Sequence, residues 1–508
     1  MMGTAKVAPG WGKGASAPWG QALGLLLSAM AIVILQGCHS RPISFSEPSA
    51  VTLPQFAPLP GAPEIPALAL PQRLEAKVSI LPSGHPWHAM ALPPSGRQSL
   101  TLVALSAEPY GQIRFLAEAL RLQRLALMQR VDLPCIDTLK ISAQLHSVAL
   151  QLSCPDSVAW GDALALLVRM VDPEEYRRLD LREAARRRAV TDRINGAVDG
   201  EMDRVWRELL LGRDHPYVRA LDEAPTQDRA DRRLQQALSQ LHRQSRWQVI
   251  TRSRVSATEE LASALSAPMD ALMALDAQVA SSSAQASVSL APEATARVPG
   301  GAIHLLDAPG SAQLQVYLGY RMPESGEAGK SGDEAQGTLI CESLAAWLGR
   351  SFTGRLFYDL REVRGWTYGI HGYCAASPMA TMLTFSGSTR LEHSGAFVSG
   401  VLDHLARAAE EAPPKAEVRA VQRYAVSRAR VATASEDAAL WEYLSRLVHP
   451  RPPLAPWLQA QDGGALRQAA ATLFARPPVI LLRGDARRIR QDLNAKLPQW
   501  PIVMVPSR

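Results

Sequence analysis

The sequence of 508 residues lacks the motifs on which most nucleotide-dependent enzymes and serine hydrolases depend. It has no phosphate-binding loop and no Gly-x-Gly-x-x-Gly fingerprint after a strand, so neither common way of holding a nucleotide phosphate is present. A Gly-x-Ser-x-Gly elbow between a strand and a helix is also missing. These absences argue against a nucleotide-dependent enzyme and against an α/β-hydrolase.

Charged residues are few, and those that are positive are overwhelmingly Arg. They make up 20% of the chain and hydrophobic residues 47%, a balance typical of a globular protein. The formal net charge of +6 favours solubility and contact with anionic surfaces, but it gives no evidence of nucleic-acid binding. One core rarely organises a chain of this length, so two or more domains are expected.

Residues 1–37 have the pattern of a lipoprotein signal peptide. The N-terminal segment contains two Lys residues and is followed by an uncharged apolar run at 23–35, which is too short to span a bilayer. The run ends in Leu-Gln-Gly-Cys, which resembles a bacterial lipobox and implies lipidation of Cys38 after cleavage. His39 stands where Asp would resemble an inner-membrane retention signal, so we expect an anchor in the outer membrane, facing the periplasm. The alternative is an uncleaved anchor helix with an incidental Cys.

The rest of the sequence divides into a spacer and two halves. Residues 38–72 are rich in Pro and are expected to form a stiff, extended spacer. Residues 73–285 and 300–508 are expected to be globular. A linker is expected at 286–299, within the Ser- and Ala-rich region that begins at Ser281.

The two halves repeat one order of elements. Each begins with a strand and a long amphipathic helix, continues with a strand pair and helical sequence, and closes with a strand and a helix. The expected elements are 99–105, 113–130, 138–153, 247–251 and 257–265 in the first half, and 312–320, 339–348, 368–388, 479–482 and 487–496 in the second. This order predicts an α+β fold of two similar halves, each an antiparallel sheet covered by helices.

Four cysteines remain after Cys38, and an oxidising envelope compartment permits disulfides. Residues 138–153 alternate as a hairpin that turns near Gln144 and Leu145. Such a hairpin brings Cys135 opposite Cys154, within bonding reach. A Cys135–Cys154 disulfide is therefore a hypothesis, which mass spectrometry of the non-reduced chain can test.

One stretch, GRSFTGRLFYDLREVRGWTYG at Gly349–Gly369, has a distinctive order of residues. A small-residue turn is followed by an Arg-Leu-Phe helix start, then Leu-Arg-Glu, then a Gly before Tyr-Gly. This pattern resembles the C-terminal domain of the pitrilysin/insulinase family of zinc peptidases, which includes mitochondrial processing peptidase and paired bacterial peptidases. Weaker support comes from His215-Pro216-Tyr217 and from the closing strand at Val479–Asp485.

The resemblance implies roles for Arg361 and Tyr368. The functional Arg and Tyr of the family's C-terminal domain lie seven residues apart, and this pair matches that spacing. By resemblance, Arg361 anchors substrate through its guanidinium, and the Tyr368 hydroxyl polarises the scissile carbonyl as an oxyanion develops. The alternative is structural: Arg361 pairs with Asp359 or Glu362, and Tyr368 only begins a strand.

The family's zinc motif is absent. Relatives bind zinc through His-x-x-Glu-His on a helix and a distant Glu, and this motif occurs nowhere in the sequence. The corresponding helix lies at 111–120, which places Arg114, Ala117 and Glu118 at the His, Glu and His positions, with the distant Glu near Asp192. A guanidinium repels a divalent cation, so we expect no metal and no catalytic residue in this chain.

Other polar residues have simpler interpretations. His85 and His88 lie in a Pro-rich strand without a nearby carboxylate, so we expect packed or solvated histidines rather than metal ligands. His404 belongs to an amphipathic helix without zinc spacing. The basic run 186–188 is interleaved with acids and indicates a solvated helix face. His371 is expected on the strand face opposite to Tyr368, where it could line a substrate chamber.

These observations predict a non-catalytic, substrate-binding subunit of a two-chain zinc metallopeptidase in the bacterial envelope. The chain would be inactive alone and would contribute Arg361 and Tyr368 to a partner that carries His-x-x-Glu-His. The expected partners are that zinc-bearing subunit, a peptide substrate and the membrane through Cys38. Zinc is expected only in the partner, and no nucleic acid is expected. The alternative is a structural or peptide-binding envelope lipoprotein without a role in proteolysis; an autonomous metallopeptidase is the least supported.

Overall fold

A computed structural model describes residues 69–71, 73–91, 98–195, 200–220, 226–254, 258–282, 301–323, 333–350 and 353–506. All of them belong to one compact unit, Ala67–Arg508. The expected signal peptide, Cys38, nearly all of the Pro-rich spacer and the linker at 286–299 lie outside the described residues. Within the described ranges, no helix is both long and apolar enough to span a bilayer.

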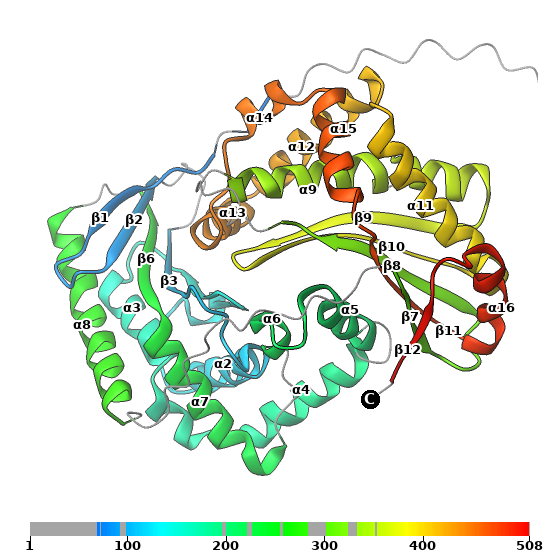
Figure 1. Cartoon of the computed structure of the whole chain (residues 1–508). Helices are drawn as coiled ribbons and strands as arrows, with labels where there is room; N and C mark the ends of the chain where they lie inside the picture. The colour runs from blue at the N-terminus through cyan, green and yellow to red at the C-terminus, as the bar shows by residue number, and fades with distance from the viewer. Residues whose placement is uncertain are drawn as a thin grey trace, which may run out of the picture. The chain divides into compact units, whose positions relative to one another are not determined.

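The first half is built on a six-stranded sheet in the order β1-β2-β6-β3-β5-β4 (Figure 1). Its strands are β1 (Lys77–Ile80), β2 (Pro86–Ala91), β3 (Ser99–Leu105), β4 (Lys140–Gln144), β5 (Ser147–Ser153) and β6 (Arg246–Ser253). The central strand β3 is buried along its whole length, because both faces of the sheet are covered at that point.

Helices cover one face of this sheet and bury a leucine-rich core against it. They are α2 (Ile113–Met128), α3 (Trp160–Arg169), α4 (Leu181–Asn195), α7 (Ala230–Gln244) and α8 (Glu259–Ser282), with short turns η1 (Ile136–Thr138), η2 (Pro173–Arg178) and η4 (Gln227–Arg229). Leu116, Leu120 and Leu127 of α2 are fully buried at the spacing of one helical face. They share one hydrophobic cluster with Leu102 of β3 and Leu150 of β5.

The second half has its own six-stranded sheet, in the order β12-β7-β11-β8-β10-β9. Its strands are β7 (Ile303–Asp307), β8 (Gln313–Arg321), β9 (Thr367–Ser377), β10 (Ala380–Arg390), β11 (Val479–Gly484) and β12 (Ile502–Val505). The helical elements are α9 (Asp333–Gly349), α10 (Arg355–Phe357), η6 (Tyr358–Val363), η7 (Leu391–His393), α11 (Ser394–Glu410), α12 (Lys415–Ala432), α14 (Leu454–Ala460), α15 (Gly463–Phe474) and α16 (Ala486–Lys496).

The strand orders confirm the predicted α+β fold of two similar halves. The order β2-β6-β3-β5-β4 in the first sheet corresponds to β7-β11-β8-β10-β9 in the second. The sheets are mainly antiparallel, but β2 pairs in parallel with β6, and β7 with β11. The sixth strand differs between the halves. β1 precedes β2 and runs antiparallel to it, whereas β12 comes from the C-terminal end and runs parallel to β7.

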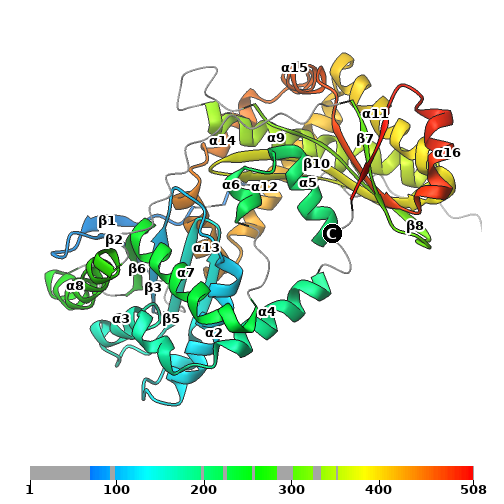
Figure 2. The ribbon, with the colours of Figure 1, turned by 60° about the horizontal axis from the view of Figure 1, so that its bottom comes forward.

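Each half also sends a helical segment onto the sheet of the other half (Figures 1 and 2). The segment of the first half is α5 (Glu201–Leu211) and α6 (Pro216–Arg219), and α5 contacts β8 and β11. Trp206 of α5 is buried in one cluster with Leu481 of β11. In the opposite direction, α13 (Glu436–Val448) packs Leu440 and other apolar residues against the first sheet. Hydrophobic burial therefore joins the two halves at two places.

Two disulfides are present among the described residues. Cys135 and Cys154 are bonded, with Cα atoms 4.9 Å apart, at the base of the β4–β5 hairpin. This confirms the hypothesis drawn from the alternating pattern. The second bond joins Cys341 of α9 to Cys374 of β9, with Cα atoms 5.6 Å apart. It was not predicted from the sequence, because it depends on how a helix packs on a strand.

The largest difference from the predicted elements is the length of α8. The sequence predicts a helix over 257–265, whereas α8 continues through Pro268 to Ser282 and takes in the first residues of the expected Ser-rich connection. A Pro inside a helix removes one backbone hydrogen bond, but buried Leu265, Met269 and Leu272 on both sides keep the helix packed against the first core.

Candidate functional site

A helical turn before β9 presents Arg361. The turn is η6, a π-helix, a form often found at functional sites. Gly365 follows it with a φ of +64°, a left-handed conformation that favours a residue without Cβ. Backbone bonds from Gly365 N to Arg361 O (3.0 Å) and from Trp366 N to Leu360 O (2.9 Å) hold the chain in this turn. Leu360 is fully buried and anchors it to the core.

The turn brings Arg361 and Tyr368 together. The Arg361 Cζ atom lies 4.9 Å from the centre of the Tyr368 ring and 4.7 Å from that of Phe357, so the guanidinium is placed against two aromatic rings. Its Nε atom is 3.4 Å from an oxygen of Glu362. Tyr368 is 87% exposed and lies at the start of β9, so its phenol is open to a ligand. The pair can offer a cation and a hydroxyl donor to one carbonyl or carboxylate.

A half-buried carboxylate braces the back of the same turn. Asp359 accepts hydrogen bonds from His404 Nε2 of α11 (3.0 Å) and from Arg364 Nε (2.9 Å). Burial raises the pKa of Asp359, but the bonds from His404 and Arg364 outweigh it and hold that pKa below its usual value. Arg364 in turn stacks on Trp366, 4.7 Å from the ring centre. This brace could not be predicted from the sequence, because Asp359 and His404 are 45 residues apart.

We expect Asp359→Asn to loosen the turn that carries Arg361. The substitution removes the charge that holds His404 and Arg364, and the loss of such charge-assisted bonds costs about 1–3 kcal/mol. Limited digestion with trypsin, followed by mass spectrometry, should show faster cleavage after Arg361 and Arg364. Asp403→Asn is the control. Asp359 and Asp403 line one cavity of 570 Å³, but Asp403 is exposed. Equal cleavage of Asp359→Asn and the wild type would contradict the brace.

Helix α2 is the helix that the resemblance places at the family's zinc position, and its side chains do not fit a metal. Arg114 is exposed in the first turn of α2, and Ala117 has no donor atom. Glu118 forms an ion pair with Arg121. Asp192 lies in α4, where its side chain is outside the described residues. Among the described residues, no group of three or more His, Cys, Asp or Glu side chains is placed to hold a metal ion.

The histidines singled out in the sequence have separate surroundings. His85 Nδ1 lies 3.2 Å from Ser83 Oγ, whereas His88 Nδ1 lies 2.7 Å from Tyr443 Oη of α13. The two rings therefore have different hydrogen-bond partners. His371 is exposed in β9.

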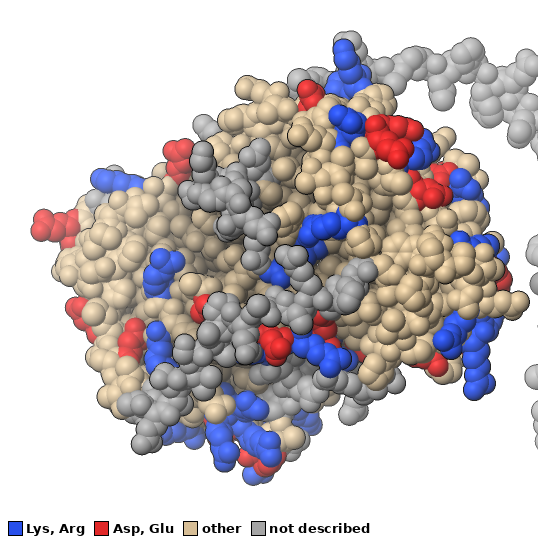
Figure 3. Space-filling view, viewed as in Figure 1, with Lys and Arg blue, Asp and Glu red and all other residues tan. Residues whose placement is uncertain are grey.

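The basic run in α4 is only partly a solvated face. Arg186 and Arg187 are exposed and share Glu183 as an ion-pair partner. Figure 3 shows Lys and Arg atoms gathered along the lower edge of the molecule, over α4 and α7. Arg188, in contrast, is 4% exposed. The predicted solvated face is therefore wrong for this residue, since it points inward from the helix.

A hydrogen-bonded chain through the His-Pro-Tyr segment joins the two halves. Tyr217 Oη accepts a bond from Met379 N of the second half (2.9 Å) and lies 2.8 Å from His146 Nε2 of the first. The other ring nitrogen of His146 lies 3.0 Å from Ser106 O, which identifies it as the protonated one. Tyr217 therefore donates to His146. The sequence resemblance includes His215-Pro216-Tyr217 but does not predict that this segment joins the two halves.

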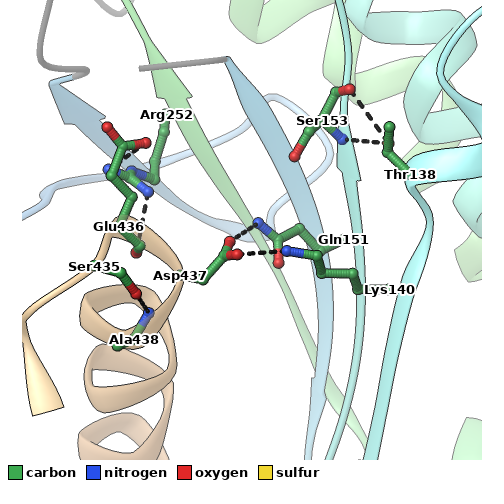
Figure 4. Close-up of polar contacts among 9 residues, drawn as sticks. All are labelled: Thr138, Lys140, Gln151, Ser153, Arg252, Ser435, Glu436, Asp437 and Ala438. Carbon is green, nitrogen blue, oxygen red and sulfur yellow. Dashed lines mark hydrogen bonds and ion pairs between the residues drawn. The ribbon is translucent and has the colours of Figure 1, made fainter. Parts of the chain in front are cut away.

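A polar cluster fixes the start of α13 on the first sheet (Figure 4). Asp437 accepts hydrogen bonds from Lys140 Nζ (2.5 Å) and Gln151 Nε2 (3.5 Å). The hydrogen bond from Lys140 is the main reason that the pKa of Asp437 lies below its usual value. Buried Arg252 donates to the Glu436 carbonyl (3.2 Å). These contacts hold the helix that the second half sends onto the first.

Comparisons with known proteins agree with this geometry. Residues 275–424 match the family model described as the peptidase M16 inactive domain. No curated protein sequence matches the chain.

Three solved structures share the fold. The peptidase M16 inactive domain from Pseudomonas fluorescens is 16% identical, with a TM-score of 0.60, and covers 81% of this chain and 98% of its own. A chain of Complex III2 from Candida albicans is 12% identical, with a TM-score of 0.59 and coverage of 84% and 99%. A putative M16-like peptidase from Alicyclobacillus acidocaldarius is 15% identical, with a TM-score of 0.54 and coverage of 82% and 99%.

The family match and the fold of these structures lead to one identification. Residues 275–424 belong to the family described as the peptidase M16 inactive domain, in a chain that shares the fold of M16-like structures and has no His-x-x-Glu-His motif in its sequence.

Proposed function

We propose that this chain is the substrate-binding subunit of a two-chain zinc metallopeptidase and supplies Arg361 and Tyr368 to a zinc-bearing partner. The observation that carries the proposal is the pairing of Tyr368 and Arg361. Tyr368 is 87% exposed, and the Arg361 Cζ atom lies 4.9 Å from the centre of its ring. The positions that the resemblance assigns to zinc binding hold Arg114, Ala117 and Glu118 instead. A large aromatic residue left this exposed beside a cation is typical of a binding surface.

Each residue has a defined task in this proposal. The Arg361 guanidinium donates two parallel hydrogen bonds to a carboxylate of the peptide, or donates to the single oxygen of a peptide carbonyl. The Tyr368 hydroxyl donates to the oxygen that gains charge when the partner's zinc-bound water attacks the peptide carbonyl. The brace at Asp359 keeps Arg361 in place without touching the substrate. One solved neighbour belongs to a multi-chain assembly, Complex III2, which supports the proposal that this fold works beside other chains.

The test is activity with a partner. The product of an adjacent reading frame that carries His-x-x-Glu-His is purified with this chain, and kcat/KM is measured on a fluorogenic peptide. We expect Tyr368→Phe to lower kcat/KM by about a hundredfold, which is the usual cost of one oxyanion donor. Tyr358→Phe is the matched control, because Tyr358 is 61% exposed on the same turn. If Tyr368→Phe and Arg361→Ala leave the partner's activity unchanged, the proposal is wrong.

The alternative is a structural or peptide-binding envelope protein without a role in proteolysis. The contact between Arg361 and Glu362 favours it, because a paired Arg can serve folding alone. The two functions differ in one measurable respect. A peptide-binding protein would bind the fluorogenic peptide with the same Kd whether or not the zinc subunit is present, and no metallopeptidase activity would depend on it.

We also propose that the chain is anchored by Cys38 in the outer membrane and faces the periplasm. The support is the Leu-Gln-Gly-Cys sequence with His39 after it. Metabolic labelling with palmitate should label the wild type and fail to label Cys38→Ser, which should appear in the soluble periplasmic fraction. Labelling of Cys38→Ser would refute the anchor.

A further inference from the structure

A mostly apolar cavity of about 350 Å³ on the second half is lined by α9, α12 and α14 (Figure 1). Leu70, Pro71 and Arg73, from the chain before β1, line another part of it. Its volume falls within the range of about 300–1,000 Å³ that is usual for small-molecule sites. The described lining residues include none from η6 or β9, so the cavity is separate from Arg361 and Tyr368. A ligand held here is therefore distinct from the peptide of the proposed function.

Short side chains at the contact between α9 and α12 leave this space open. The two helices pack against each other, but at the cavity α12 presents Ala425, Ala429 and Ala432, and α9 presents Ala346. Residues three and four apart share one face of a helix, so the three alanines of α12 form one wall. Trp457 of α14, which is 9% exposed, adds a large apolar wall. Protein interiors are normally packed densely, so a hollow with such walls suits an apolar chain.

Arginines surround the same cavity. The Nη1 atoms of Arg428 and Arg451 approach one oxygen of Glu342, at 3.6 and 3.3 Å. A single carboxylate therefore serves two guanidiniums. Arg73 donates to a neutral acceptor, the Pro452 carbonyl (3.4 Å). Arg73 and Arg428 are exposed, so an anion can reach these guanidiniums from solvent.

The other carboxylate of the lining does not balance these charges. Glu442 forms an ion pair with Arg446, which is not a lining residue, at 2.9 Å. Among the described lining residues, Arg73, Arg428 and Arg451 are therefore left with Glu342 as their only available counter-charge. This excess of positive charge attracts an anion to the cavity.

We propose that this cavity binds a single-chain carboxylic acid of medium length, with its alkyl chain between α9 and α12 and its carboxylate at Arg73, Arg428 and Arg451. The alkyl chain gains from burial against the alanines and Trp457, because each CH₂ group removed from water favours binding. The guanidiniums match a carboxylate, to which each can donate two parallel hydrogen bonds. A cationic head group would meet the same guanidiniums and be repelled. An apolar hollow with a cationic rim therefore selects an amphiphile with a negative head.

The test uses the purified full-length chain in detergent-free buffer and isothermal titration calorimetry at about 50 mM salt. Three ligands are compared: decanoate, butanoate and decyltrimethylammonium. The Kd of decanoate should be at least about tenfold lower than that of butanoate, which has the same head but a shorter chain. It should also be at least about tenfold lower than that of decyltrimethylammonium, whose head is a cation. Absence of decanoate binding would refute the site, and equal Kd values for decanoate and decyltrimethylammonium would refute the role of the arginines.

Ala429→Phe tests the apolar part of the cavity. The phenyl ring would take up space that the alkyl chain needs, so the Kd of decanoate should rise at least about tenfold. Circular dichroism checks that the variant is folded. Ala416→Phe is the matched control, because Ala416 is exposed on the same helix and is not a lining residue. Unchanged decanoate binding in folded Ala429→Phe would place the ligand elsewhere and overturn the assignment.

Arg73→Gln combined with Arg428→Gln tests the cationic rim. Both side chains are exposed, so their replacement should leave the fold intact. The preference for decanoate over decyltrimethylammonium should fall from about tenfold to less than about threefold, because two of the three guanidiniums are gone. Arg430→Gln is the matched control, since Arg430 is exposed on α12 and is not a lining residue. Retention of the full preference in the double variant would contradict the position assigned to the carboxylate.

Discussion

Replacing Trp206 with Ala is expected to lower the free energy of unfolding by about 3–5 kcal/mol and to uncouple the two halves. Trp206 belongs to α5 of the first half, yet it is 3% exposed against the second sheet. Its ring packs edge-on against Tyr317 of β8, with ring centres 5.7 Å apart, and its Nε1 donates to Thr384 Oγ1 of β10 (3.2 Å). Truncation therefore removes a large buried surface and leaves Thr384 without this donor.

Differential scanning calorimetry measures this effect directly. For a chain of this size, about 4 kcal/mol corresponds to a fall in Tm of about 4 °C. We further expect the wild type to unfold in one transition and the variant in two, because α5 is one of the two segments that join the halves. Leu125→Ala is the control, since Leu125 is 48% exposed on α2 and its loss should cost less than about 0.5 kcal/mol. An unchanged Tm in Trp206→Ala would show that this contact does not stabilise the protein.

The strands that the sequence predicted well are those with continuous or alternating apolar residues. The range predicted for the first central strand, 99–105, is that of β3, and the hairpin at 138–153 is found as β4 and β5. The short strands β7 and β12 were not predicted. β12 is a four-residue edge strand with exposed Val503 and Met504, so it has little of the alternation that burial on one face produces.

Contacts between elements that are distant in sequence could not be predicted at all. The Cys341–Cys374 bond requires α9 to approach β9 closely, and a Cβ on Gly349 of α9 would lie 2.2 Å from the backbone nitrogen of Gly372 in β9. Two glycines make that approach possible. The residues next to each glycine in the sequence do not show that a glycine is required there, because the lack of space for a Cβ atom comes from the other element.

In the candidate site, too, local contacts were predicted from the sequence and contacts with a distant helix were not. Arg361 and Tyr368 were predicted to act together, and the structure places the Arg361 Cζ atom 4.9 Å from the centre of the Tyr368 ring. The roles of the two residues stay a prediction. The structural alternative named Asp359 or Glu362 as the partner of Arg361, and the contact found is with Glu362. Asp359 binds His404 and Arg364 instead. Local spacing predicts which residues share a turn, but the support behind that turn comes from another helix.

Acidification from pH 7 to pH 5 should destabilise the protein through histidines that are buried where the halves meet. Burial lowers the pKa values of His88, His146 and His215, and that of His215 falls to about 4, with Arg321 contributing. His215 is 4% exposed and its Nδ1 accepts the Tyr217 N–H (3.1 Å), a bond that protonation would break. These side chains therefore favour the neutral form in the folded protein.

The sign of the effect follows from proton binding. The unfolded chain binds a proton at each His near pH 6.5, whereas the folded chain resists protonation until a lower pH, so the free energy of unfolding falls as pH drops below 6.5. For His215, the difference between pKa values of about 6.5 and 4 removes about 2 kcal/mol between pH 7 and pH 5. The carboxylates whose pKa values are lowered, such as Asp359 and Asp437, lose their contributions below that window.

His215→Asn isolates the contribution of one ring. His215 caps α6, and Asn is a good helix cap that can also accept the Tyr217 N–H, but it does not titrate. Urea unfolding at pH 7 and pH 5 should show that the variant loses about 2 kcal/mol less than the wild type over this range. His371→Asn is the control, because His371 is exposed and its replacement should leave the pH dependence unchanged. An equal loss in the wild type and in His215→Asn would show that acid sensitivity comes from other groups. The junction between the halves would then have to be stabilised in a way that does not depend on the neutral form of this ring.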